Sequence, residues 1–153
     1  MALTQVIGDG LATSGLPAGS VLQVVNATHN TETSTSSASY VDTGLTASIT
    51  PTSATSKVLV FVDMTGIGAV AAGQRSNMAI VRNSTNILEF EKEAPYGTMA
   101  SEFGLGGVGS NYLDSPATTS ATTYKIQIKA TTGTVYWNLK SGHSTITLME
   151  IAG

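Results

Sequence analysis

The sequence contains no cysteine and very little charge. Without cysteine there can be no disulfide bond and no thiolate metal site. Charged residues fill 11% of the 153 positions, against about a quarter in ordinary soluble proteins. The seven basic residues are scattered and the formal net charge is -3. A nucleic acid is therefore not expected as a partner, because phosphate binding needs clustered Lys and Arg.

Long apolar runs are also missing. No segment approaches the roughly 20 consecutive apolar residues that cross a bilayer, so we expect no membrane insertion. The opening segment MALTQVIGDGLATSGLPAGS has no basic region followed by an apolar one, which is not typical of a secretory signal. We expect a protein that is made in the cytoplasm and not processed.

Ser, Thr and apolar residues fill the places that charge leaves. Hydrophobic residues make up 41% of the chain and the mean hydropathy is +0.15, which is too apolar for a disordered protein. Small hydroxyl and β-branched side chains suit a pleated, half-buried surface and predict strands. A surface with so few charges also indicates burial against copies of the chain or against neighbours.

Segments of strand length with alternating or continuous apolar residues recur along the chain, and none has a helical period. They are separated by short polar connections rich in Gly, Ser, Thr, Asn and Pro, which is typical of an antiparallel β-sandwich of about eight to nine strands. We expect residues 1–18 to form an N-terminal arm or attachment segment and residues 19–153 the sandwich. The expected strands are 20–28, 40–50, 57–65, 78–83, 86–93, 101–113, 123–130, 134–139 and 144–151.

Two of these segments carry more specific expectations. KVLVFVDMT (57–65) is a nearly continuous apolar run, which predicts a strand in the middle of a sheet that is buried on both faces. In residues 40–50 the alternation holds if Gly44 forms a bend or bulge.

Two glycine patterns resemble dinucleotide-binding motifs but lack the necessary context. GLGGVG (104–109) is followed by SNYLDSP, in which Pro116 prevents a helix of useful length. TGIGAVA (65–71) leaves about eight residues for a crossover helix, which is too short for a βαβ unit. Bends or bulges in strands explain both patterns better, and no cofactor is expected.

Candidate catalytic and metal-binding residues are few. The two histidines, His29 and His143, lie in a polar loop and in a tight turn, where they are expected to be solvated. No nucleophile-elbow motif is present, and no carboxylate lies at ligand spacing from either histidine, so neither a hydrolytic triad nor zinc is expected. Glu89, Glu91 and Glu93 alternate and could line a cation site, but a charged, solvated strand edge is the favoured interpretation.

Exposed aromatic rings are the weak candidates for ligand binding. Tyr136 and Trp137 are adjacent and would face opposite sides of a strand, so one of them could be exposed and stack on a sugar. Tyr96, in the loop KEAPYGT, is the other candidate. Core packing or a contact between subunits is the main alternative for Trp137.

The segment NYLDSPATTSATTYKIQIKA (111–130) places an acid beside Ser and Pro, as in some active sites. A simpler interpretation is the end of one strand, a loop and the start of the next. Asp114 and Ser115 would then hydrogen-bond local backbone groups, and Tyr124, Ile126 and Ile128 would face the core.

Four blocks of the sequence resemble a family of small bacteriophage virion proteins and fibre domains. The resemblance covers most of the chain from residue 18 onward and includes no catalytic signature. It implies a jelly-roll-like β-sandwich, similar to complement- and tumour-necrosis-factor-type trimers, that forms a homotrimer and attaches to the particle by its N-terminal segment. Residues 71–109 match least, where partner-dependent variation would be expected. The blocks are AGSVLQVV (18–25), SYVDTGLTASITPTSATSKVLV (39–60), NYLDSPATTSATTYKIQI (111–128) and STITLMEIA (144–152).

Residues and resemblance together predict a non-enzymatic structural protein of the virion, with other tail or capsid proteins as partners. Two alternatives remain open. One is a receptor-binding module that contacts a host glycan or protein through loops such as 71–77 and 94–101. The other is a decoration protein that stabilises the head without binding a receptor. An enzyme is the least favoured class.

Overall fold

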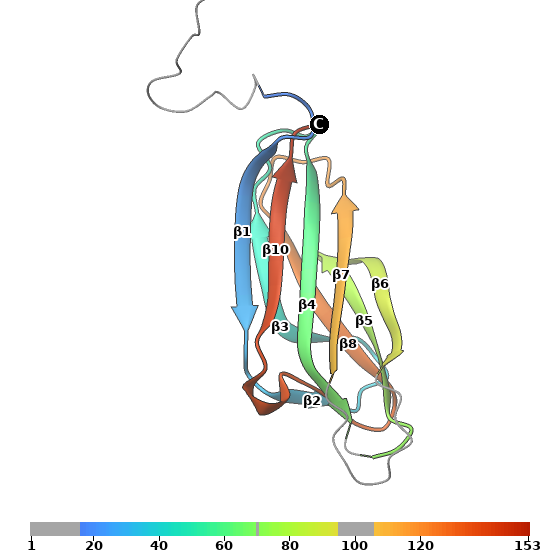
Figure 1. Cartoon of the computed structure of the whole chain (residues 1–153). Helices are drawn as coiled ribbons and strands as arrows, with labels where there is room; N and C mark the ends of the chain where they lie inside the picture. Colours follow the sequence, from blue (N-terminus) through green and yellow to red (C-terminus); the bar gives the residue numbers. More distant parts are fainter. Residues whose placement is uncertain (1–15, 70, 95–105) are drawn as a thin grey trace, which may run out of the picture.

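The computed structural model describes residues 16–69, 71–94 and 106–153, and nearly all of this part is strand and loop (Figure 1). Its one helical element is the short 3-10 turn η2 (Leu139–Ser141). The predicted all-β class is thus confirmed. The strands are β1 (Val21–His29), β2 (Thr33–Thr35), β3 (Val41–Ile49), β4 (Lys57–Ala69), β5 (Arg75–Arg82), β6 (Thr85–Ala94), β7 (Gly106–Asp114), β8 (Thr122–Thr132), β9 (Val135–Trp137) and β10 (Ser144–Ile151).

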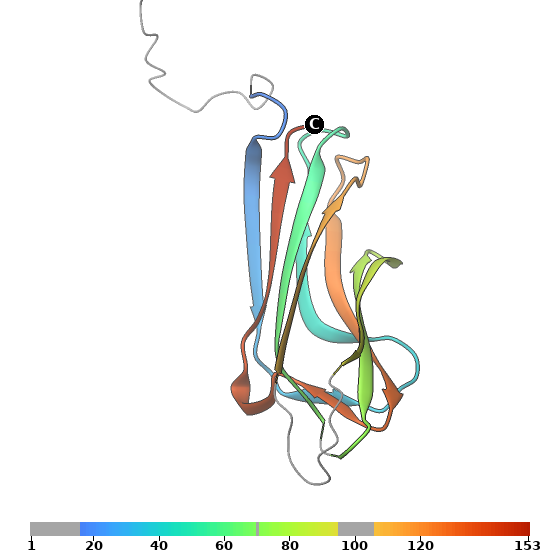
Figure 2. The same cartoon turned by 45° about the vertical axis from the view of Figure 1, so that its right-hand side comes forward.

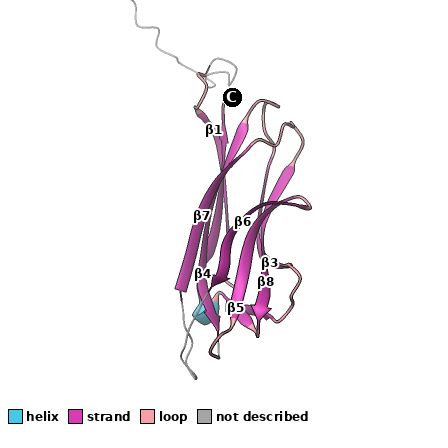
Figure 3. Cartoon of the chain, turned by 90° about the vertical axis from the view of Figure 1, so that its right-hand side faces the viewer, coloured by secondary structure: helices cyan, strands magenta, loops and turns pink. Residues whose placement is uncertain are grey.

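The strands form two antiparallel sheets that pack face to face (Figure 3). In the first sheet β1, β10, β4 and β7 lie in that order. The C-terminal end of β4 also pairs with β9, which pairs in turn with β2. The second sheet has the order β3-β8-β5-β6. The eight long strands therefore have the arrangement of a jelly roll, in which successive strands pass repeatedly from one sheet to the other.

The core lies between the sheets and is built by simple alternation along the strands. In β8 the residues Tyr124, Ile126 and Ile128 are fully buried, and the residues between them are half-buried. β10 and β3 follow the same period of two, as expected for strands with one face on the core. Turning the molecule by 45° shows the two sheets lying side by side along their length (Figure 2), and the core side chains fill the volume between them.

One expectation for the central strand is confirmed and another is wrong. β4 pairs with β10 on one side and β7 on the other, so it does lie within the sheet. It is not buried on both faces, however. Val58, Val60 and Val62 point into the core, whereas Phe61 between them is 41% exposed. The apolar run in residues 57–65 therefore combines one face buried in the core with one face that is apolar and exposed to solvent.

Two glycines bend strands as their spacing suggests. Gly44 has a φ of 89° and lies where the register of β3 against β8 shifts between Asp42 and Thr46. Gly66 has a φ of 60° and lies where β4 shifts against β7. A left-handed φ is accessible to glycine at little cost, so the bulge expected at Gly44 is confirmed.

The two ends of the described chain meet at one end of the sandwich (Figure 1). The Gly19 amide donates to the Ala152 carbonyl over 2.8 Å, and the Ala152 amide donates to the Ser20 carbonyl, also over 2.8 Å. Most of the predicted arm, residues 1–15, lies outside the described residues. A hollow of about 250 Å³ opens beside this junction, lined by Leu16, Leu22, Thr52, Ser53, Thr55, Ser56, Ala152 and Gly153.

Candidate functional site

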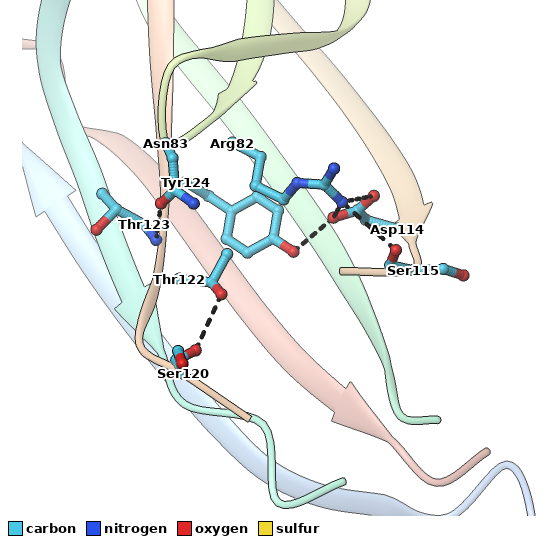
Figure 4. Close-up of polar contacts among 8 residues, drawn as sticks. All are labelled: Arg82, Asn83, Asp114, Ser115, Ser120, Thr122, Thr123 and Tyr124. Atoms are coloured by element: carbon cyan, nitrogen blue, oxygen red, sulfur yellow. Dashed lines mark hydrogen bonds and ion pairs between the residues drawn. The ribbon is translucent and has the colours of Figure 1, made fainter. Parts of the chain in front are cut away.

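Asp114 is the centre of a polar cluster that joins the two sheets (Figure 4). Its carboxylate accepts two hydrogen bonds from Nη1 of Arg82, each of 2.9 Å. It accepts a third from the Tyr124 hydroxyl over 2.7 Å. Asp114 is 5% exposed and Tyr124 is fully buried. Asp114 ends β7 in the first sheet, whereas Arg82 and Tyr124 belong to the second, so the cluster bridges the sandwich.

The role expected for Asp114 was therefore wrong in detail. Its side chain does not bond local backbone groups but binds two side chains from the facing sheet. Arg82 also donates to the Ser115 carbonyl over 3.4 Å, which holds the start of the loop. Sequence reasoning missed Arg82 because the partner lies 32 positions away and no local pattern indicates the contact.

This cluster links the two sheets through hydrogen bonds and an ion pair. Burial, followed by the hydrogen bond to Asp114, raises the pKa of the Tyr124 phenol well above its usual range, so it stays a neutral donor. Nearby bonds fix the loops around it: the Thr123 amide donates to Asn83 Oδ1 over 3.0 Å, and the Thr122 hydroxyl donates to the Ser120 carbonyl over 3.1 Å. Figure 4 shows all of these contacts.

A second polar cluster lies on the outer side of the second sheet around Glu89. The Tyr40 hydroxyl and the Asn77 amide both donate to this carboxylate, and Lys92 lies 3.2 Å from it. Hydrogen bonds from Tyr40, then Asn77 and Lys92, lower the pKa of Glu89 to about 2. Lys129 lies 4.6 Å above the Tyr40 ring, which is cation–π geometry.

The glutamates of β6 thus support the solvated-edge interpretation. β6 is an edge strand of the second sheet. Glu93 pairs with Arg75 over 2.6 Å, so Glu89 and Glu93 both have cationic partners within the chain. In residues 16–69, 71–94 and 106–153 no three His, Cys, Asp or Glu side chains come together in a way that could hold a metal ion.

The two histidines are far from equivalent. His143 is an exposed residue before β10, as expected. His29 is not in a solvated loop but ends β1, half-buried, with its Nδ1 2.9 Å from the amide nitrogen of Asn138. A Cβ on Gly44 would come within 2.5 Å of the His29 ring, so the absence of a side chain there makes room for the imidazole.

Asn138 organises the turn that follows β9. Its backbone is left-handed with a φ of 55°, and its side chain is fully buried. Its Oδ1 accepts from the Ser144 hydroxyl over 2.5 Å. Asparagine tolerates this backbone conformation better than most residues, which is the one signal in the sequence that could have singled it out.

The structure places the two candidate ligand-binding aromatics differently. Trp137 is 1% exposed, and its indole Nε1 donates to the Thr43 carbonyl over 2.9 Å. The core-packing alternative therefore describes this ring, which offers no face to a sugar in the single chain. Tyr136, half-exposed, points the other way, as expected from alternation. Tyr96 lies outside the described residues.

Glu150 is a fully buried carboxylate on the inner side of β10. It accepts from Gln23 over 2.6 Å, from the Thr52 amide over 2.7 Å and from the Thr52 hydroxyl over 2.8 Å. Burial alone would raise the pKa of Glu150, but these hydrogen bonds outweigh it and lower the pKa. The carboxylate ties the turn after β3 to β1 and β10 near the chain ends.

Comparison with solved structures identifies a similar fold in structures from infectious bursal disease virus. The crystal structure of the infectious bursal disease virus VP2 subviral particle superposes with a TM-score of 0.54 at 12% identity, covering 97% of this chain and 38% of that chain. The structure of the infectious bursal disease virus Gx strain gives a TM-score of 0.51 at 13% identity, with the same coverage. The chain thus spans well under half the length of these two viral chains.

Comparison of the sequence itself gives no relative. It matches no protein-family model and no curated protein. Across the described ranges, no helix is long and apolar enough to span a bilayer.

The carboxylates of Asp114, Glu89 and Glu150 all accept hydrogen bonds from donors within the chain. This arrangement is suited to holding the fold together.

Proposed function

We propose that this protein is a non-enzymatic structural subunit of a bacteriophage virion, most simply a fibre-type appendage. In this proposal it forms a homotrimer and attaches to other tail or capsid proteins through the N-terminal arm, residues 1–18. The observation that carries the proposal is the jelly-roll sandwich, which over 97% of the chain follows subunits of a virus particle. The resemblance of its sequence blocks to phage fibre domains adds the assignment to a phage and the trimer.

The internal chemistry supports a structural role. The buried ionisable side chains Asp114 and Glu150 are each saturated by donors from elements distant in the sequence. Such contacts stabilise the fold and occupy these two carboxylates, so neither of them is free for general acid or base catalysis.

A capsid decoration protein is the second candidate. Two of the solved structures with a similar fold come from infectious bursal disease virus, and one of them is the VP2 subviral particle. A subunit that reinforces the head by covering its joints would need the same rigid sandwich and no receptor site.

Contact with the host is the part of the fibre proposal that separates the two candidates. It would use a host surface glycan or protein and the segments 71–77 and 94–101, which lie in the region that resembles the fibre family least. Residues 75–77 belong to β5 and are not part of a loop as expected, and residues 95–101 lie outside the described residues. Tyr96 is the aromatic residue that this interaction would employ, because Trp137 is buried.

Deleting the gene from the producing virus distinguishes these functions. For a fibre, particles should form and keep their stability but adsorb poorly to host cells, and added purified protein should compete with adsorption. For a decoration protein, adsorption per intact particle should be normal and heat or low salt should break the heads. Particles that are unchanged in both respects and lack no component would contradict the proposal that this is a virion subunit.

A further inference from the structure

The outer side of the first sheet carries an unusually apolar surface, which we name the uncharged face. Two rows of side chains cross all four long strands in register. Among the described strand residues on this side, only Lys57 and Asp63 are charged. Both belong to β4, and they lie on either side of the two rows. The first row is Val24, Met149, Leu59 and Leu113, and the second is Asn26, Thr147, Phe61 and Asn111.

Three apolar members of this face are open to solvent in the single chain, and Leu59 and Met149 are half-buried. Val24 is 55% exposed, Leu113 is 47% exposed and Phe61 is 41% exposed. Val21, at the start of β1, adds a further side chain that is 52% exposed. These four residues are the large hydrophobic side chains found exposed among the described residues, and all belong to strands of the first sheet.

The outer side of the second sheet is entirely different. It carries the Asp42–Lys125 ion pair at 2.8 Å, the Arg75–Glu93 pair and the Glu89 cluster. These charges are neutralised within the chain and remain in contact with water. These contacts involve seven charged residues, whereas the described strands of the first sheet carry only Lys57 and Asp63 on their outer side.

We propose that the uncharged face is the interface through which copies of this chain associate. The inference rests on the self-assembly part of the proposed function and names the surface responsible. Contiguous exposed apolar patches of this kind mark interaction sites. An apolar centre with charges only at its margins is also the anatomy of a protein interface.

The size of the face suits contact between copies. Four strands about 4.8 Å apart and about seven residues of about 3.4 Å each give a flat footprint of about 450 Å². Two copies would together cover about 900 Å² before the relief of the side chains is counted, close to the roughly 1,000 Å² that a specific interface needs.

The composition of the face favours a second copy over an unrelated charged surface. A copy brings the same apolar rows and amide and hydroxyl groups, so no charge at the centre is buried without a partner. Lys57 and Asp63 would remain at the margins, where they keep contact with water. A partner with a charged surface would have to bury those charges against Leu59, Phe61 and Leu113.

The test compares purified chains with substitutions on each side of the sandwich. Phe61→Glu combined with Leu113→Glu places two charges in the uncharged face at exposed positions. Ser48→Glu adds a charge at an exposed position of β3 on the other side and is the matched control. Phe61→Thr with Leu113→Thr removes apolar area without charge and covers the case in which the charged variant does not fold, and circular dichroism checks folding of each.

Sedimentation and light scattering then give the mass over a protein concentration range on the order of 1–100 µM. The unmodified chain and Ser48→Glu should form the same oligomer, and the face variants should dissociate with a dissociation constant raised by about 30-fold or more. A folded face variant that keeps the oligomer overturns the assignment of the face, while self-assembly stands. A monomer for the unmodified chain across the whole range overturns self-assembly itself, and the inference with it.

Discussion

Replacing Asp114 by alanine should destabilise the fold without touching any activity. The substitution leaves the buried Tyr124 hydroxyl without its acceptor, which costs about 1–3 kcal/mol. It also removes the ion-pair partner of Arg82, whose side chain is 28% exposed. Because Arg82 keeps contact with water, losing the ion pair should cost about 1 kcal/mol, as for exposed pairs, and not the larger value for buried pairs. We expect the free energy of unfolding to fall by about 3 kcal/mol.

Urea denaturation at one fixed protein concentration measures this change, because association would otherwise shift the midpoint. The thermal midpoint should fall by about 6–12 °C for a domain of this size. Asp114→Asn keeps an oxygen for the Tyr124 hydroxyl and should lose less, about 1 kcal/mol. Asp42→Ala, which breaks a surface pair with an aspartate side chain that is 56% exposed, is the control and should change stability by less than about 1 kcal/mol.

A double-mutant cycle between Asp114→Ala and Tyr124→Phe isolates the contact itself. The two changes should be non-additive by about 1 kcal/mol or more, because each removes one side of the same hydrogen bond. Additive effects, or an Asp114→Ala protein as stable as the unmodified chain, would refute the reasoning. So would the loss of a measurable activity in a variant that still folds and assembles.

Three further substitutions test other parts of the structure. Trp137→Phe should cost about 2–3 kcal/mol by urea denaturation, from a lost hydrogen bond and a small cavity; strong acrylamide quenching of the single tryptophan of the unmodified protein would show instead that the ring is exposed. Gly66→Ala should destabilise the fold by more than about 1 kcal/mol, because the φ is positive and the added Cβ would lie 2.5 Å from the Leu139 amide nitrogen. Gly106→Ala is the control and should be nearly neutral, because the space around Gly106 is open. Equal losses of stability in the two variants would contradict this account. Glu150 has a lowered pKa in the folded chain, so its contribution is complete above the ordinary glutamate pKa of about 4.3 and is lost as the pH falls through the folded value. The stability difference between the unmodified chain and Glu150→Gln should therefore be constant near neutral pH and shrink below about pH 4.3; a difference that grows on acidification would reverse the assigned sign.

The strands could be predicted from the sequence because alternation is local. The alternation in residues 123–130 predicts a half-buried strand, and β8 has that pattern of burial. Residues 144–151 predict a strand with apolar groups on both faces, and in β10 one face is buried and the other half-buried. Glycine at a bulge could be predicted for the same reason, since Gly44 interrupts an otherwise regular period. The all-β sandwich followed from these local patterns and from the short polar connections between them.

Contacts between distant residues could not be predicted. Asp114 meets Arg82 and Tyr124 only because the two sheets stack, and Glu150 meets Thr52 across 98 positions. The expectation that β4 is buried on both faces was wrong for a related reason. A continuous apolar run has the same sequence pattern whether the chain covers both faces of the strand or leaves one exposed. The uncharged face, to which Leu59 and Phe61 belong, is visible only once the neighbouring strands are in register.

The position of this protein on the intact particle tests the central claim most directly. Electron cryomicroscopy of virions from the producing virus should show density for the ten-stranded sandwich in a tail or head appendage, in the proposed form with three copies around an axis. Purified, infectious particles that contain no copy of the chain, by density and by mass spectrometry, would contradict the account.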